Sequence, residues 1–188
     1  MNIGNIAEQR LVKRLRNGEN GAMREFYSLY ADQLAGICAR YIPDHQDMKD
    51  VFQESLIRII TNITDFDFRG AGSLKAWASK VVVNESLKFL NDAKRQELRL
   101  LDYDVADEPE DDDPPISDIP PDEIQRMVSQ LPTGYRTVFN LYVFEHRSHQ
   151  EIASLLGIKE TSSASQLCRA KNLLAKMIRE YNNQQFPR

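Results

Sequence analysis

The chain has 188 residues, of which 41% are hydrophobic and 28% are charged, and its formal net charge is −4 at pH 7. This length allows two small domains with modest apolar cores. No apolar run is long enough to cross a membrane and the N-terminus lacks a signal-peptide pattern, so we expect a soluble, cytoplasmic protein. Cys38 and Cys168 are far apart in the sequence, and we expect no structural disulfide.

The acidity of the chain is concentrated in one segment. Residues 100–123 contain 11 Asp and Glu, no Lys or Arg, and five prolines, whereas residues 1–99 and 124–188 each carry a net positive charge. Repelling charges and prolines disfavour helix, so this segment is predicted to be an extended linker. A solvated spacer is the simpler interpretation. The alternative is that the carboxylates occupy a basic channel that otherwise holds a nucleic acid.

The N-terminal half shows helical periodicity and no strand pattern. Leu11, Val12 and Leu15 predict a short helix that ends near Gly18. A longer helix is predicted next, and Pro43 ends it. Its apolar residues at helical spacing are Phe26, Leu29, Tyr30, Leu34, Ile37, Cys38 and Tyr41.

A third helix is predicted to begin with Asp47 as its N-cap. Its expected buried side consists of Met48, Phe52, Ser55, Leu56, Ile59 and Ile63. The opposite face carries Asp50, Gln53, Glu54 and Ile57. An apolar residue among carboxylates and an amide indicates a docking surface for a basic protein partner, although an exposed Ile is common enough to need no cause.

Residues 66–73 are predicted to form a loop in which aromatic rings flank glycines and an arginine, and Ser73 is the expected cap of the next helix. One stripe of that helix carries Trp77, Lys80, Asn84, Lys88, Asn91 and Arg95. Cations, amides and aromatic rings in this arrangement favour binding of single-stranded nucleic acid. Taken by itself, however, Trp77 has the helical spacing of a core residue.

The segment from Ser148 to Lys176 is predicted to be a helix-turn-helix. Ser148 and Glu151 match a capping box, and Gly157 suits the turn. The apolar face of the first helix is expected to consist of Ile152, Ala153, Leu155 and Leu156. This motif presents its second helix to the major groove of DNA. The alternative is an ordinary helical hairpin with a solvated polar face.

The second helix of this motif is predicted to be capped by Thr161 or Ser162. Its buried stripe is expected to be Leu167, Ala170, Leu174, Met177 and Ile178, and its outward face Ser162, Ser165, Arg169, Asn172 and Lys176. A metal site from His146, His149 and Cys168 lacks a convincing fourth ligand, so we expect no metal. No nucleophile with a base and no phosphate-binding loop stands out, and no enzyme activity is expected.

Several of these segments together resemble the extracytoplasmic-function sigma factors of bacterial RNA polymerase, which belong to the sigma-70 family. The segments are, in order, Asp50-Val51-Phe52-Gln53-Glu54-Ser55-Leu56, the 66–73 loop, Trp77 with Asn84, and Leu131-Pro132 through Arg169-Ala170-Lys171. The resemblance implies an all-α protein with two small domains: a sigma region 2 helical bundle over residues 5–97 and a sigma region 4 helix-turn-helix over residues 122–182. Residues 98–121 would be an acidic, proline-rich, flexible linker lying in the RNA path of the polymerase.

The resemblance also implies roles for individual residues. The core polymerase would be bound by Asp50, Gln53, Glu54 and Ile57. The promoter minus-ten element would be bound by Phe66, Phe68, Arg69, Lys80 and Asn84, to which the stripe adds Trp77 and Lys88. The minus-35 element would be read by Ala164, Ser165, Cys168 and Arg169, to which the outward helix face adds Ser162 and Lys176.

The resemblance therefore implies a non-enzymatic initiation factor without cofactors. Its partners would be core RNA polymerase through the beta and beta-prime subunits, promoter DNA and an anti-sigma factor. The family commonly has Thr-Val-basic-Ser-Arg at the start of the recognition helix, whereas this chain has Ser-Ser-Ala-Ser-Gln at residues 162–166. Two cations are missing, so weak binding of isolated duplex is expected. The alternative function is a response-regulator-type helix-turn-helix transcription factor, which leaves the Asp50 face and the Trp77 stripe unexplained.

Overall fold

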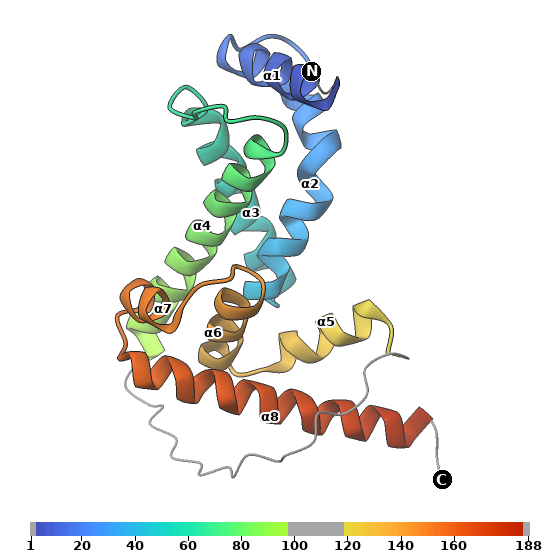
Figure 1. The fold of residues 1–188 in the computed structure, drawn as a ribbon, viewed down its shortest axis with the longest axis vertical. Coiled ribbons are helices and arrows are strands. Elements are labelled where there is room, and N and C mark those ends of the chain that lie inside the picture. The colour runs from blue at the N-terminus through green and yellow to red at the C-terminus, as the bar shows by residue number, and fades with distance from the viewer. Residues whose placement is uncertain (1–2, 98–118, 186–188) are drawn as a thin grey trace. The chain divides into compact units, whose positions relative to one another are not determined.

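The computed structural model describes residues 3–97 and 119–185, and these residues form eight α-helices and no strand (Figure 1). The predicted all-α class is confirmed. The helices are α1 (Ile3–Arg16), α2 (Ala22–Tyr41), α3 (His45–Thr61), α4 (Ser73–Glu97), α5 (Pro121–Gln130), α6 (Thr133–Val143), α7 (His149–Leu156) and α8 (Glu160–Gln185). The chain divides into two compact units, residues 1–95 and 96–188.

The first unit is a helical bundle in which α2 packs against both α1 and α3. Its core holds large apolar side chains from all four helices, including Leu11, Phe26, Leu34, Ile59 and Leu74, each at most 2% exposed. The helical spacing predicted most of this core. Leu29 is an exception, because it is 59% exposed on the outer side of α2.

The start of α3 differs from the sequence prediction by three residues. Asp44 is the N-cap, and its carboxylate accepts hydrogen bonds from the backbone N–H groups of Gln46 and Asp47, both at 2.9 Å. The predicted cap, Asp47, lies in the first helical turn instead, where its negative charge still favours the positive end of the helix. The helix buries Phe52, as predicted, and also Val51.

The start of α4 also differs from its prediction. Ser73 is the first helical residue and not the cap, since its hydroxyl donates a hydrogen bond to the Gly70 carbonyl at 2.6 Å. The carboxylate of Glu8, a residue of α1, instead accepts hydrogen bonds from the Gly72 and Leu74 backbone N–H groups at this helix end. A carboxylate from a distant helix therefore replaces the predicted local cap.

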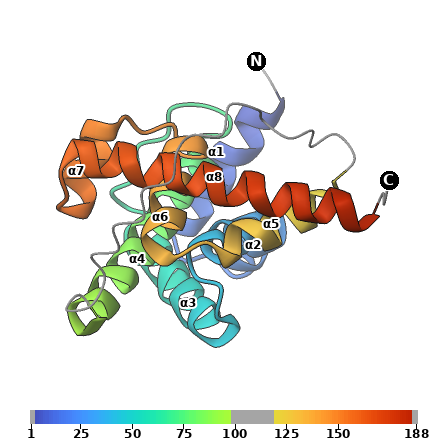
Figure 2. The same cartoon turned by 90° about the horizontal axis from the view of Figure 1, so that it is seen from below.

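The second unit is built around α8, which packs against α5, α6 and α7. In Figures 1 and 2, α7 lies beside the N-terminal end of this long helix. One core cluster joins α5 and α8 and consists of Ile119, Met127, Val128, Leu131, Ala170, Leu174 and Ile178. Most of the predicted buried stripe of α8 belongs to it. Residues 98–118 of the predicted acidic linker lie outside the described residues, whereas Ile119 is part of this core.

The predicted helix-turn-helix is present as α7, a turn and α8. The capping box is confirmed, because the Ser148 hydroxyl accepts from the Glu151 N–H while the Glu151 carboxylate accepts from the Ser148 N–H. Gly157 ends α7 with φ at 65°, a left-handed conformation that favours glycine. Leu155 was predicted to be on the apolar face, but it is 43% exposed. Helix α8 begins at Glu160, so Thr161 and Ser162 lie inside its first turn and are not caps.

Candidate nucleic-acid and protein interfaces

The predicted docking face on α3 is a continuous exposed surface. Asp50, Gln53, Glu54 and Ile57 are all exposed, and the apolar Ile57 side chain is 55% exposed. Gln46 donates a hydrogen bond from its amide to Asp50 at 3.3 Å. The side chains that pack inward from this helix leave the two carboxylates in solvent, where their charge is available to a cationic partner. We call these four residues the α3 acidic face.

The loop between α3 and α4, residues 62–72, places its aromatic rings unequally. Phe66 is 5% exposed, and its ring lies 5.1 Å from the half-buried ring of Trp77. Phe68 is half-buried, and Arg69 extends into solvent, where its guanidinium lies 3.2 Å from the Asp67 carboxylate. The loop therefore offers Phe68 and Arg69 at its surface, while Phe66 packs beneath it.

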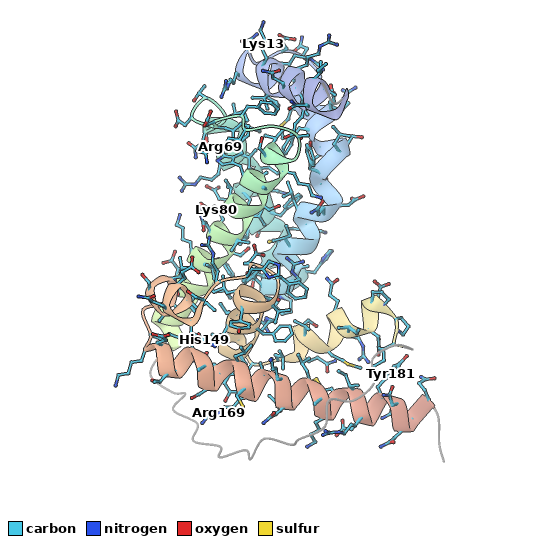
Figure 3. All side chains as sticks on the ribbon, in the orientation of Figure 1. Lys13, Arg69, Lys80, His149, Arg169 and Tyr181 are labelled. Atoms are coloured by element: carbon cyan, nitrogen blue, oxygen red, sulfur yellow. The ribbon has the colours of Figure 1, made fainter. Side chains whose placement is uncertain are left out.

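The stripe on α4 continues this surface along the helix. Lys80, Asn84 and Lys88 are all exposed. Figure 3 shows Arg69 on the loop and Lys80 further along α4. The Lys88 ammonium lies 3.9 Å from the Glu85 carboxylate, which also pairs with Arg58 of α3 at 3.1 Å. Cationic and amide groups beside a partly exposed ring are the groups that bind phosphates and unpaired bases. We call the loop and this stripe the α4 face.

One side of α8, from Ser162 to Lys176, forms the third surface, here called the α8 face. Ala164, Ser165, Cys168 and Lys176 are exposed, and Ser162 and Arg169 are half-buried. The Ser165 hydroxyl donates to the Thr161 carbonyl at 3.0 Å, so its oxygen retains accepting capacity. In Figure 3, Arg169 lies on the side of α8 that faces away from α6. Guanidinium and hydroxyl groups on an exposed helix face can hydrogen-bond to base edges in a major groove.

Ser163, in the middle of this segment, is fully buried. Its hydroxyl lies 3.0 Å from the Nδ1 atom of His149, the first residue of α7, and the His149 ring stacks on Tyr142 at 4.8 Å. These contacts join α6, α7 and the start of α8, and thereby hold the α8 face at a defined angle to α7. Sequence periodicity gave no indication of this polar contact.

Cys168 and His149, which the sequence offers as potential metal ligands, have different surroundings. Cys168 is exposed on α8, and His149 is engaged by Ser163. Within the described ranges, no group of three or more His, Cys, Asp or Glu side chains is arranged to hold a metal ion. No helix in the same ranges has the length and apolar character needed to cross a membrane. Cys38 lies in the first unit, where burial raises the pKa of its thiol.

Two family matches correspond to the two structural units. Residues 26–96 match Sigma-70 region 2, and residues 122–174 match Sigma-70, region 4. Together these matches cover more than half of the 188 residues. The chain belongs to the sigma-70 family.

Curated proteins of similar length match nearly the whole chain. The ECF RNA polymerase sigma-E factor of Haemophilus influenzae is 27% identical over 92% of this chain and 96% of its own length. The ECF RNA polymerase sigma factor SigW of Bacillus subtilis is 24% identical over 90% of this chain and 95% of its own length. A solved structure of the sigma factor RpoE with the anti-sigma factor NepR from Bartonella quintana is similar in fold, with a TM-score of 0.50, 17% identity, and coverage of 85% of this chain and 98% of that one.

Proposed function

We propose that this protein is an RNA polymerase sigma factor of the extracytoplasmic-function type, which directs core polymerase to specific promoters. The observation that carries the proposal is the occurrence of the region 2 and region 4 matches in one chain, in that order, each on its own helical unit. Such a factor supplies binding surfaces and no chemistry of its own. Its working compartment is the cytoplasm, where the polymerase acts.

The α3 acidic face is the proposed contact with core polymerase. Its two carboxylates complement a basic partner, and the exposed Ile57 gives the contact an apolar centre that would be buried on binding. The beta and beta-prime subunits of the core enzyme are the proposed partners. Because the face lies on a single packed helix, its geometry requires no rearrangement before docking.

The α4 face is the proposed contact with the minus-ten element. Phe68 and Arg69 would meet an unpaired base, with Lys80, Asn84 and Lys88 along the neighbouring backbone. Phe66 and Trp77 pack together beneath the loop. In this arrangement Phe66 supports the loop, and a direct contact with a base requires its ring to leave this packing.

The α8 face is the proposed contact with the minus-35 element. Arg169 is the strongest candidate for reading a base, because a guanidinium can bind guanine with two hydrogen bonds. Ser162, Ala164, Ser165 and Cys168 offer shorter side chains closer to the helix start. Lys176 lies two turns beyond Arg169 and is assigned to phosphate, which positions a protein without reading sequence.

An anti-sigma factor is the proposed regulator. The solved RpoE structure contains such a partner. In this chain, both units carry exposed large apolar side chains that a partner could cover, among them Ile57 and Ile60 in the first unit and Tyr142, Phe144 and Leu155 in the second. The test is to measure transcription from its promoters in cells in which other genes are deleted. If transcription depends only on the amount of this protein, and no deletion changes it, this proposal is contradicted.

A response-regulator-type transcription factor remains the second candidate. It would use the second unit alone to bind duplex DNA, and the first unit would sense a signal. It leaves the region 2 match and the α4 face without a role, and is therefore not favoured.

Charge reversal on the α3 acidic face tests the docking proposal. Asp50→Lys and Glu54→Lys should abolish co-purification with core polymerase, since a like-charge contact at an interface costs several kcal/mol. Both residues are exposed, so helicity measured by circular dichroism should be unchanged. Glu180→Lys, at an exposed position on α8, is the matched control and should still co-purify. Undiminished binding by both α3 variants contradicts the assignment.

A further inference from the structure

The loop of residues 62–72 is anchored at its C-terminal end by a carboxylate from α1. Glu8 accepts hydrogen bonds from the Gly72 N–H at 2.6 Å and from the Leu74 N–H at 2.7 Å. The Glu8 residue is only 9% exposed. The first N–H groups of a helix have no partner within that helix, and the helix dipole favours an anion there. Glu8 therefore caps α4 and fixes the point at which the loop ends.

The same helix anchors the N-terminal end of the loop. The Arg16 guanidinium donates from Nε to the Ile63 carbonyl at 3.2 Å, and from its second terminal nitrogen to the Phe66 carbonyl. In Figure 1, the loop runs beside α1. Glu8 and Arg16 belong to one continuous helix, so the spacing between the two ends of the loop is set by α1.

Between these anchors lies the exposed part of the loop. The Arg69 side chain is 80% exposed, and Phe68 beside it is half-buried. Gly70 and Gly72 have φ angles of 117° and 86°, which residues other than glycine rarely adopt. The glycines permit the turn, but they do not by themselves select one conformation. The anchors on α1 restrict the loop conformations that the two glycines would otherwise allow.

We propose that Glu8 and Arg16 are positioning residues for minus-ten recognition. They act through the loop by holding Phe68 and Arg69 in the geometry that meets the base. The inference rests on the proposed function, because it needs the loop to contact promoter DNA. A binding group must be held to within about half an ångström, so an unanchored loop would bind several bases with similar affinity.

Glu8→Gln and Arg16→Met in the full-length chain test the inference. Each variant is combined with core polymerase and a promoter library randomised in the minus-ten element, and transcripts are sequenced. The preference for the best base at one minus-ten position should fall about tenfold, which corresponds to about 1.4 kcal/mol. Preferences in a library randomised in the minus-35 element should not change. Arg16→Lys, which keeps a cationic donor, should restore part of the preference.

Glu25→Gln and Arg14→Met are matched controls, because they break an exposed ion pair between α2 and α1 that does not involve the loop. Both should keep the wild-type preferences. A merely structural role would lower output from all promoters equally, and that result would overturn the inference. If Glu8→Gln fails to fold, the base preferences of Arg16→Met and Arg16→Lys test the inference. Wild-type protein without promoter-specific transcripts would overturn the proposed function itself, whereas active wild-type protein and variants with unchanged preferences would overturn this inference alone.

Discussion

At the scale of single residues, the charged side chains separate into those that hold the fold and those that face a partner. Arg136 is 5% exposed and donates to the Ser129 and Leu131 carbonyls at 3.1 and 2.6 Å, so it fastens the turn between α5 and α6. Burial lowers the pKa of this guanidinium. Lys176, by contrast, is exposed on α8. Charge alone did not distinguish these two roles in the sequence.

Arg169 and Lys176 are expected to affect DNA binding differently. Arg169→Ala should reduce transcription and relax preference at one base of the minus-35 element, because a bidentate contact contributes about 1 to 3 kcal/mol of discrimination. Lys176→Ala should weaken all promoters about equally and reduce the salt dependence of binding by roughly one ion. A promoter library randomised in the minus-35 element, assayed at two salt concentrations, measures both effects. An unchanged base preference in the Arg169 variant would show that Arg169 does not read a base of the minus-35 element.

At the scale of helices, the sequence predicted the interiors of the elements better than their ends. Phe26, Leu34 and Tyr41 lie at helical spacing and are buried, since a repeating apolar pattern reports directly on the buried side of a helix. The N-terminus of α4 could not be predicted in this way. Its cap is Glu8, which is 64 residues from Gly72, and local rules consider only neighbouring side chains. The sequence contained one signal of this buried carboxylate. Glu8 lies three residues before Leu11, and this spacing places it on the side of α1 that packs into the core.

The predicted site residues also divide into positions that helical spacing predicts and positions that it does not. The exposed positions on α3 and α4 followed from helical spacing, as for Asp50 and Lys80. Loop positions did not, because Phe66 and Phe68 are both aromatic and only tertiary packing determines which ring is buried. At α7, where two neighbouring side chains cap the helix, the local prediction was confirmed.

The capping box of α7 predicts a dependence of stability on pH. Hydrogen bonds from the Ser148 backbone N–H, the Arg147 side chain and the Ser148 hydroxyl lower the pKa of Glu151 from its ordinary value of 4.5. A lowered pKa in the folded state stabilises the fold above the unfolded pKa, and this contribution is lost as the pH falls through the folded pKa. Glu151→Gln should therefore be less stable than wild type at pH 7, with the difference shrinking as the pH falls below 4.5.

Urea denaturation of the full-length chain at several pH values measures this effect. Glu180→Gln, at an exposed position on α8, is the control for loss of a carboxylate elsewhere on the same unit. A stability difference for Glu151→Gln that stays constant down to pH 3 would contradict the assigned role of the carboxylate.

At the scale of the whole molecule, the proposed function requires both units in one chain. The resemblance to extracytoplasmic-function sigma factors was visible in the sequence because its motifs occur in order over most of the length, and the family matches now cover both units. The roles assigned to the three faces remain proposals. Each face belongs to a single unit, so each can be altered without disturbing the core of the other unit.

Transcription by purified core polymerase tests whether this protein acts as a sigma factor. The full-length protein is added to core enzyme with fragmented genomic DNA, and the 5′ ends of the run-off transcripts are sequenced. The sigma-factor function predicts new start sites that share a minus-ten and a minus-35 element, that require this protein, and that disappear with Asp50→Lys or Glu54→Lys. Start sites identical to those of core polymerase alone, from a protein that is folded by circular dichroism, would contradict it.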